Sequence, residues 1–384
     1  MKIVAARVLE FRRQLDGRSW NPTFRWHERR APLVVLDTDA GVQGIGEAWS
    51  RQPQIALVLD ALARRFLPAL VDDDVKHAAE IVARVAARTP SLEPWVAAAA
   101  ASAIDIALWD AKARAAGLPL WRALGGHRGR VAVYASGGLY RDGATHGDLA
   151  SEFERYVEMG FTHVKMKIGA LSRESDVERA RAVRQAIRDD TVLWVDAVNQ
   201  LSRTSARAWC ESLADAGVAA IQAPLSFDDV AGMVEINESI LPVVATEAEH
   251  REDAFRALVD ARAVTFLQHC LGLCGGFSGA MRIDSYAAER GVKSTPQCFS
   301  TAVMQAASLH FGAARDNVAT VEYHRFHDHL APLLPDEMKR IDCGFVDLGE
   351  APGLGVAPPS LGEQPGGGYV RLHRQLTRAD SIPT

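Results

Sequence analysis

The chain has 384 residues, 48% of them hydrophobic and 24% charged, and its formal net charge is −5. This length predicts two domains or one barrel with an attachment, and the composition is that of a globular protein rather than a disordered one. The slight negative charge argues against a nucleic-acid partner, and the apolar runs are too short to predict a membrane-spanning helix.

The first 125 residues predict an α+β unit. A strand from Ile3 to Phe11 precedes two strands that form a hairpin around the turn Asp39-Ala40-Gly41. The hairpin strands are expected at 32–37 and 42–48. The spacing of apolar residues then predicts helices at 51–70, 75–88 and 95–116.

After Gly125-Gly126, short apolar runs alternate with helical stretches as far as residue 340. Strands are predicted at 131–136, 163–167, 193–196, 219–222, 243–245, 264–268, 292–294 and 318–321. Helices are predicted at 148–158, 174–188, 204–216, 230–239, 251–257, 279–289 and 301–311. This alternation predicts an α/β fold, a parallel (β/α)7β barrel over residues 126–340. An open doubly wound sheet is the alternative, but no Gly-x-Gly-x-x-Gly motif follows any strand.

The two ends of the chain and the cysteines bear on its location. Charges recur at Arg7, Glu10, Arg12 and Arg13, so the N-terminus has no signal-peptide core. The five cysteines are an odd number without paired spacing, which predicts free thiols in a reducing cytoplasm. The tail from Gly344 is rich in Gly and Pro and is expected to be irregular.

Two lysines end the second predicted barrel strand. Lys165 and Lys167 alternate with Met166, so both point to the same side of the strand. Two adjacent ammonium groups repel each other, which lowers the pKa of one and makes it a possible base. The alternative is a lysine pair on a solvated face, which the apolar neighbours Val164 and Ile168 disfavour.

Oxygen-bearing side chains end the next three predicted strands. Asp196, Gln222 and Glu247 each follow an apolar run, about one βα unit apart. Side chains at the ends of parallel barrel strands converge, and oxygen atoms of this kind are ligands for a hard cation such as Mg²⁺. A single Asp in such a position is more often a helix cap, but three successive units favour the metal site.

With these residues, the sequence resembles the mandelate racemase and muconate lactonizing enzyme-like branch of the enolase superfamily. The resemblance covers nearly the whole chain. It depends on AIDIALWDAKARAAGLPLWRALGG, VKMKIG, VDAVNQ, the run Pro-Val-Val-Ala-Thr-Glu ending at Glu247, Gly275-Gly276 and Glu322.

The resemblance implies a capping domain at residues 1–125 over a modified barrel, with residues 341–384 wrapping back toward that domain. It also implies a bound Mg²⁺ at the positions of Asp196, Gln222 and Glu247. The proton α to a carboxylate would be removed by the base motif of Lys165 and Lys167, with Glu322 also in the catalytic site. Stabilisation of the resulting enolate is what the divalent ion would contribute.

Three positions depart from the family pattern. The second metal ligand is usually Glu and is Gln222 here, so the site has one negative charge fewer and is expected to bind Mg²⁺ more weakly. The family's second base is an Asp–His pair, and this chain has Cys270 and Gln297 at those positions. Neither side chain is a strong base in that role. A Cys270 thiolate, ionised next to the metal, remains an alternative base.

The segment from Gly17 to Arg30 contains three aromatic residues and four arginines. This content predicts a substrate lid formed by Trp20, Arg25 and Trp26 over an acidic, hydroxylated ligand. A disordered polar loop is the alternative.

These features favour a Mg²⁺-dependent lyase, a hydro-lyase that dehydrates a sugar acid. Dehydration needs one base, whereas racemisation needs bases on both faces of the carbon, so a racemase, epimerase or cycloisomerase ranks second. A catalytically divergent binding protein of the same fold is the third hypothesis. The expected partner is a small carboxylate, and the chain is expected to form a homo-oligomer.

Overall fold

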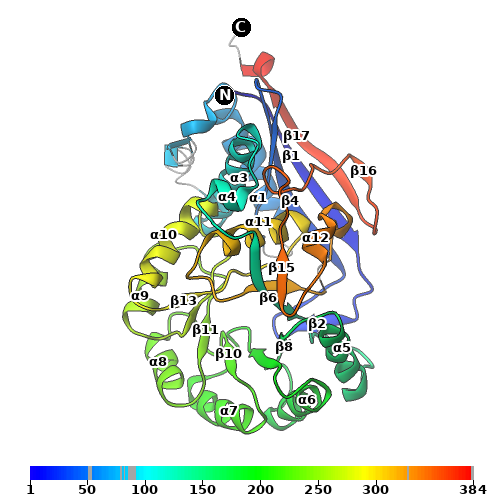
Figure 1. The fold of residues 1–384 in the computed structure, drawn as a ribbon, viewed down its shortest axis with the longest axis vertical. Helices are drawn as coiled ribbons and strands as arrows, with labels where there is room; N and C mark the ends of the chain where they lie inside the picture. The colour runs from blue at the N-terminus through cyan, green and yellow to red at the C-terminus, as the bar shows by residue number, and fades with distance from the viewer. Residues whose placement is uncertain (51–53, 78–79, 82, 85–91, 327, 382–384) are drawn as a thin grey trace.

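The computed structural model describes residues 1–384 except 51–53, 78–79, 82, 85–91, 327 and 382–384. Figure 1 shows a ring of parallel strands and helices, with an antiparallel sheet and α3 beyond one end of it. The fold is therefore α/β with a barrel-like parallel sheet and an N-terminal α+β domain, which confirms the predicted fold class.

The N-terminal domain is built on an antiparallel sheet with the strand order β16-β17-β1-β4-β5. Its first strands are β1 (Ile3–Gln14), β4 (Glu28–Thr38) and β5 (Gln43–Glu47). Helix α3 (Pro94–Ala115) lies against β5, where a Cβ atom on Gly44 or Gly46 would come within about 2 Å of an α3 carbonyl oxygen. Glycine at these two positions is thus what permits the close approach of helix and strand.

The predicted helix at 51–70 is interrupted in its described part. Helix α1 (Ile55–Ala61) continues into a π-helical turn (Leu62–Phe66) and a 3₁₀ turn (Leu67–Ala69), and Pro68 lies in the last of these. A helix was predicted at 75–88. The structure has a 3₁₀ turn at its start (Val75–His77), and most of the later residues lie outside the described ranges.

The parallel sheet runs in the order β13-β12-β11-β10-β9-β8-β6-β14. Its strands are β6 (Arg130–Ser136), β8 (His163–Lys167), β9 (Val192–Asp196), β10 (Ala220–Gln222), β11 (Val243–Ala245), β12 (Phe266–Leu267), β13 (Lys293–Ser294) and β14 (Val321–His324). A single parallel bridge between Ser294 and Val318 spans the gap from β13 toward β14. The last strand was predicted at 318–321, but β14 begins only at Val321. Val318 forms the bridge to Ser294 and lies outside the strand.

Helices alternate with these strands and surround them. They are α5 (His146–Glu158), α6 (Arg173–Ala186), α7 (Arg203–Asp215), α8 (Val230–Ser239), α9 (Glu252–Asp260), α10 (Gly276–Ala288) and α11 (Ala302–Ala314). Polar side chains cap five of them at their N-termini: Thr145, Ser172, Ser202, Asp229 and Thr301. Short helices α4 (Leu120–Ala123) and α12 (Asp336–Lys339) and a 3₁₀ turn (Ala331–Leu333) complete the connections.

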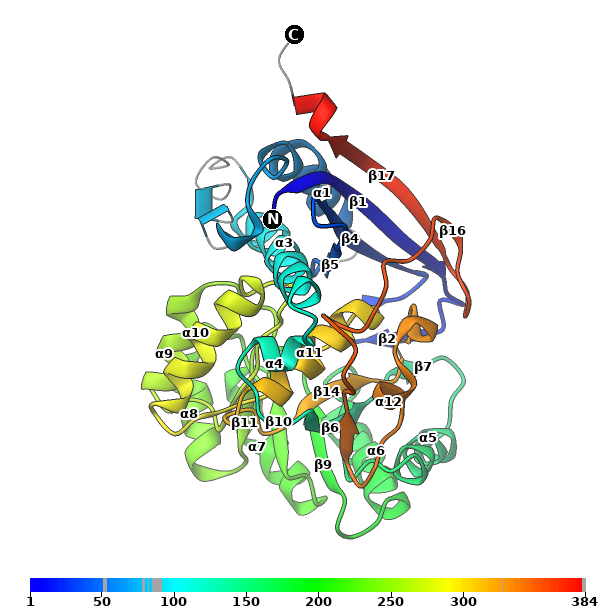
Figure 2. The same ribbon diagram turned by 45° about the horizontal axis from the view of Figure 1, so that its top comes forward.

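The C-terminal segment is more regular than its composition predicts. Strand β15 (Phe345–Asp347) pairs with β6, and β16 (Gly362–Glu363) pairs with β17 (Tyr369–Thr377). Strand β17 in turn pairs along β1, as Figure 2 shows. The expectation of an irregular tail was wrong for this part, since the pairing with β1 is non-local and leaves little pattern in the strand's own sequence.

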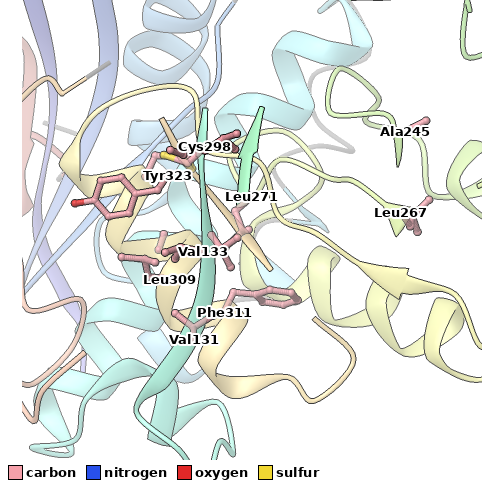
Figure 3. Close-up of a cluster of buried hydrophobic side chains, with 14 of the residues drawn as sticks. Val131, Val133, Ala245, Leu267, Leu271, Cys298, Leu309, Phe311 and Tyr323 are labelled. Atoms are coloured by element: carbon pink, nitrogen blue, oxygen red, sulfur yellow. The ribbon is translucent and has the colours of Figure 1, made fainter. Parts of the chain in front are cut away.

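A continuous apolar core lies between the parallel sheet and its helices. In Figure 3, Val131 and Val133 of β6 lie beside Leu309 and Phe311 of α11, and all are buried. Within the described residues, no helix combines the length and apolar character needed to cross a membrane.

Two buried acids of α3 attach the N-terminal domain to the rest of the chain. Asp105 accepts hydrogen bonds from the backbone and the hydroxyl of Ser278 at the start of α10. Asp110 accepts from Ile45 N and Leu354 N, which joins β5 to the C-terminal segment. These contacts fix the N-terminal domain over the ends of the barrel strands.

Candidate active site

A cavity of about 430 Å³ lies where the barrel strands end under the N-terminal domain. The barrel contributes Lys165, Lys167, Val198, Asn199, Gln200, Gln222, Glu247, Ala248, Gln297, Phe299 and Glu322. The N-terminal domain contributes Asn21, Thr23, Phe24, Trp26, Arg29, Trp49 and Ser50. This is the edge at which barrel enzymes carry their catalytic groups.

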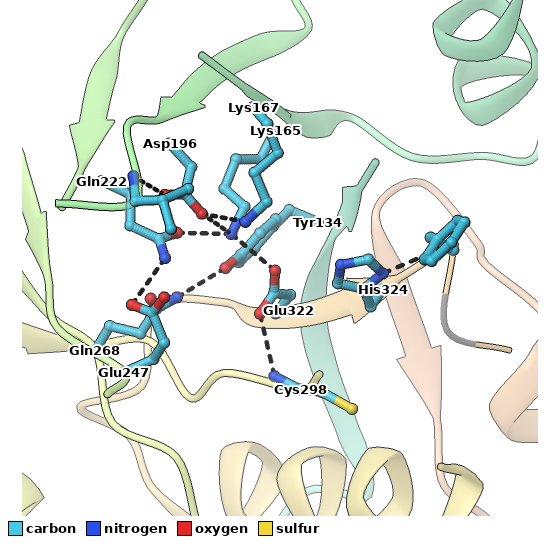
Figure 4. Close-up of polar contacts among 12 residues, drawn as sticks. Tyr134, Lys165, Lys167, Asp196, Gln222, Glu247, Gln268, Cys298, Glu322 and His324 are labelled. Atoms are coloured by element: carbon cyan, nitrogen blue, oxygen red, sulfur yellow. Dashed lines mark hydrogen bonds and ion pairs between the residues drawn. The ribbon is translucent and has the colours of Figure 1, made fainter. Parts of the chain in front are cut away.

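The strand register explains why the polar residues meet. Lys167 of β8 is paired with Asp196 of β9, and Asp196 is paired with Gln222 of β10. Side chains at paired positions of neighbouring parallel strands point the same way, so these three form a row across the end of the sheet. Glu247 follows β11 and extends the row, as Figure 4 shows.

Lys165 is held by oxygen atoms on several strands. Its Nζ atom donates to Gln222 Oε1 at 2.6 Å and to Glu322 Oε1 at 2.7 Å, and it lies 3.3 Å from Asp196 Oδ2. Burial opposes its charge, but the carboxylates of Glu322 and Asp196 outweigh burial and raise the pKa of Lys165 well above its ordinary value. The predicted lowering of a lysine pKa by its neighbour therefore does not hold for Lys165, which stays charged.

Lys167 reaches the cavity from the same strand. Its Nζ atom donates a hydrogen bond to Asp196 Oδ2, and the side chain is 7% exposed. Burial tends to raise the pKa of Asp196, but the two ammonium groups outweigh it and hold that pKa below its usual range. Among the described residues, Lys167 has one carboxylate partner and Lys165 has two, so Lys167 is the lysine freer to react with a ligand.

Gln222 links the lysine side of the site to Glu247. Its Nε2 atom donates to Glu247 Oε2 at 3.0 Å, while its Oε1 atom accepts from Lys165. Because an ammonium group only donates hydrogen bonds, Lys165 fixes this orientation of the amide. Burial and the charge of Asp196 raise the pKa of Glu247.

The donor set fits a divalent cation. Two carboxylates and an amide oxygen, from Asp196, Glu247 and Gln222, are the oxygen ligands that Mg²⁺ accepts alongside water and substrate oxygens. Ligation by the Gln222 oxygen competes with its hydrogen bond to Lys165. Among the described residues, no three His, Cys, Asp or Glu side chains form a metal-binding group, and the residue at position 222 is an amide rather than one of these four types.

Gln297 and Cys270, the two positions of the missing Asp–His pair, are neighbours through a parallel backbone bridge. Gln297 lines the cavity and is 4% exposed, and its Oε1 atom has no hydrogen-bond partner among the described residues. Cys270 is 1% exposed and is not part of the cavity wall, and burial raises the pKa of its thiol well above the ordinary value. A thiolate base at Cys270 is therefore not supported.

Glu322 and Tyr134 both contact Lys165. Glu322 accepts from Lys165 through Oε1 and from Cys298 N through Oε2, at 3.2 Å. Tyr134 of β6 was not foreseen from the sequence, and its ring lies 5.5 Å from the Lys165 ammonium group. The Tyr134 hydroxyl accepts a hydrogen bond from Gln268 Nε2 at 3.0 Å, shown in Figure 4.

The predicted lid is an ordered hairpin, and its three named residues have different roles. Strands β2 (Ser19–Asn21) and β3 (Phe24–Arg25) pair with each other, and β2 pairs with β7 (Tyr140–Arg141). Trp26 lines the cavity and is 2% exposed.

The other two lid residues lie outside the cavity wall and fasten the hairpin. Trp20 stacks on Tyr140 with ring centroids 4.6 Å apart, and Arg25 pairs with Asp142. Phe24 and Arg29, which the sequence analysis did not single out, line the cavity instead.

Comparisons with known proteins agree with this geometry. Residues 148–360 match the "Enolase C-terminal domain-like" family model, and residues 24–125 match the "Mandelate racemase / muconate lactonizing enzyme, N-terminal domain" model. The chain is 30% identical to D-galactarolactone cycloisomerase from Agrobacterium fabrum, over 93% of this chain and 96% of that protein. It is also 30% identical to arabinonate dehydratase from Saccharolobus solfataricus, over 68% of this chain and 70% of that protein.

Solved structures of proteins from the same family also superpose on this chain. The structure of L-talarate dehydratase from Polaromonas sp. JS666, complexed with Mg and L-glucarate, superposes with a TM-score of 0.83 at 25% identity. The match covers 94% of this chain and 95% of that one. Other relatives of similar identity include an epimerase of hydrophobic dipeptides. The chain belongs to the enolase superfamily, in its mandelate racemase and muconate lactonizing enzyme-like branch.

Proposed function

We propose that the protein is a Mg²⁺-dependent lyase that removes the proton α to a carboxylate and dehydrates a sugar acid. The observation that carries this proposal is the asymmetry of the cavity. Lys167 faces it from β8, whereas the opposite position holds Gln297, whose neutral amide cannot take a proton. A site with one base suits an elimination better than a racemisation.

The roles of the chain's own residues follow from their contacts. Lys167 is the proposed base: its amine takes the α-proton, and the electron pair left on carbon expels the β-hydroxyl group. The same Lys167, now protonated, returns its proton to the departing oxygen, so that water leaves from the face on which the reaction began. Gln297 donates a hydrogen bond to the substrate and orients it.

Charge that develops on the substrate carboxylate needs stabilisation in a site shielded from water. Lys165 supplies a fixed positive charge there, because Glu322 and Gln222 hold its ammonium group in place. Asp196, Gln222 and Glu247 would hold Mg²⁺, which would add its own electrostatic stabilisation of this charge.

A cycloisomerase is the second candidate. The relative that this chain matches over 93% of its length is a lactone cycloisomerase. Opening a lactone by elimination also needs a single base beside the α-carbon, so the asymmetry of the site fits that reaction too.

The test is a panel of aldonic acids, aldaric acids and their lactones, each incubated with the protein and Mg²⁺. A carbonyl assay for the 2-keto-3-deoxy product detects dehydration, and NMR detects loss of a lactone. We expect the product from at least one sugar acid, and no product with Lys167→Ala. Product formation that persists in Lys167→Ala, or no dehydration of any acid in the panel, would contradict the proposal.

A further inference from the structure

Three buried side chains near Lys167 form a cluster that the proposed reaction does not use. Asp176, in the first turn of α6, and Arg179, three residues later, are 0% and 6% exposed. Arg179 Nη1 donates to Asp176 Oδ1 at 2.8 Å, and the Tyr140 hydroxyl of β7 donates to the same oxygen at 2.7 Å. Burial raises the pKa of Tyr140, so its hydroxyl group stays protonated and keeps this bond. None of the three residues lines the active-site cavity.

The cluster holds the backbone at and after Lys167. Arg179 Nη1 also donates to Lys167 O at 2.9 Å, and its Nη2 atom donates to Gly138 O, just beyond the end of β6, at 3.1 Å. Asp176 accepts from Gly169 N, two residues after Lys167, at 2.7 Å. One guanidinium group thereby joins the ends of β6 and β8 to the start of α6.

Tyr140 connects the same cluster to the hairpin of β2 and β3. The Arg179 guanidinium group lies 4.0 Å from the centroid of the Tyr140 ring, and the Trp20 ring of β2 stacks on Tyr140. The hairpin that contributes to the cavity wall and the strand that carries Lys167 are therefore both held at Arg179.

Packing alone does not require this ion pair. Two charges that leave water lose hydration, and their mutual attraction often does little more than offset that loss. The pair does provide direction, because the planar guanidinium fork fixes several acceptors at once. Direction matters for a base, since an error of about 1 Å in placing a reacting group can cost about 10²-fold in rate.

We propose that Arg179 is a positioning residue for Lys167, and that Asp176 and Tyr140 hold Arg179 in place. The inference rests on the proposed function, in which the Lys167 amine is the base. Arg179 acts through the backbone carbonyl of Lys167: it fixes the end of β8, and with it the point from which the Lys167 side chain extends into the cavity.

The test compares Arg179→Gln with the matched control Arg184→Gln. Arg184 lies on the same helix and also donates to a backbone carbonyl, Thr191 O, at 2.7 Å. Thr191 directly precedes β9, so this contact lies at the opposite end of the strand from Asp196 and the cavity. In Arg179→Gln, Asp176 keeps its bonds from Tyr140 and Gly169 N.

Steady-state kinetics with a sugar acid from the panel is the first measurement. Arg179→Gln should lower kcat at least about tenfold and change KM less than about threefold, because the substrate still binds while the base is misplaced. Arg184→Gln should change neither parameter by more than about twofold. Arg179→Lys, which keeps the charge but not the planar fork, should recover part of the lost kcat.

The second measurement needs no substrate. Competitive acetylation of the native protein, followed by peptide mass spectrometry, gives the reactivity of Lys167 relative to the exposed Lys293. In Arg179→Gln this ratio should rise at least about threefold, because the end of β8 opens locally, and in Arg184→Gln it should not change.

Several results would overturn the inference. These are equal losses of kcat in Arg179→Gln and Arg184→Gln, a raised KM without loss of kcat, or an unchanged reactivity of Lys167 in Arg179→Gln. If Arg179→Gln does not fold, Arg179→Lys with the kcat and the Lys167 reactivity of the unmodified protein would overturn it as well. If no sugar acid is dehydrated but Lys167 becomes more reactive only in Arg179→Gln, the proposed reaction fails and the positioning of Lys167 by Arg179 stands.

Discussion

Restoring a carboxylate at position 222 should convert a weak cation site into a stronger one. In Gln222→Glu, the 3.0 Å hydrogen bond from Nε2 to Glu247 Oε2 becomes a contact between two carboxylate oxygens. The lost bond costs about 1–3 kcal/mol, and the like charges add to this cost. An ion pair between the new carboxylate and Lys165 offsets part of it. We therefore expect the free energy of unfolding of the metal-free variant to fall by about 1–3 kcal/mol.

Bound Mg²⁺ should restore the free energy of unfolding that Gln222→Glu loses in its metal-free form. A third carboxylate among the ligands should raise Mg²⁺ affinity at least about tenfold, which is about 1.4 kcal/mol. Titration calorimetry with Mg²⁺ measures the affinity, and thermal unfolding with Mg²⁺ or with EDTA measures the linked stabilisation. Gln200→Glu is the matched control, since it adds the same charge to the cavity wall away from the ligand row. If neither Gln222→Glu nor Gln200→Glu binds Mg²⁺ more tightly than the unmodified protein, the negative charge missing at position 222 does not limit the Mg²⁺ affinity of the site.

Three further predictions concern other parts of the molecule. Burial raises the pKa of Asp105 from 3.8 to about 6, so its proton favours the folded state. The resulting penalty is nearly complete at pH 7 and is relieved as the pH falls through 6 toward 3.8. Asp105→Asn should therefore lack about 1 kcal/mol of the stabilisation that denaturant unfolding shows between pH 7 and pH 5. Asp142→Ala removes the anchor of Arg25 and of Trp20 Nε1, at 3.1 Å, so steady-state kinetics should show a raised KM with kcat little changed, and an unchanged KM would refute the role of the hairpin. Cys343 is the exposed thiol and Cys270 is buried, so a thiol reagent should modify one cysteine of the native protein and none of the Cys343→Ser variant, and labelling of Cys270 would contradict the buried position.

The barrel and the side-by-side positions of the polar residues at its strand ends were predictable from the sequence because both depend on local patterns. Apolar runs alternate with helices, and a polar residue at the end of each run must point where its neighbours point. Lys167, Asp196 and Gln222 accordingly occupy paired positions in the sheet. The (β/α)7β architecture follows from the same alternation.

What the sequence did not predict depends on contacts between distant segments. Strand β17 forms against β1, whose residues lie more than 350 positions earlier in the chain. The charge state of Lys165 is set by Glu322, 157 residues away, which the argument from two neighbouring lysines left out. Arg29 was one of four arginines in the predicted lid segment, and only its burial and its place in the cavity wall distinguish it.

The central claim is that proton abstraction occurs on the Lys167 side alone. The most direct measurement is ¹H NMR of deuterium incorporation at the α-carbon, with a substrate and its α-epimer each incubated with the protein and Mg²⁺ in D₂O. We expect exchange or elimination of one epimer only, abolished in Lys167→Ala and reduced much less in Gln297→Ala, because a neutral amide only orients the substrate. Exchange of both epimers, or a loss in Gln297→Ala as large as in Lys167→Ala, would contradict it.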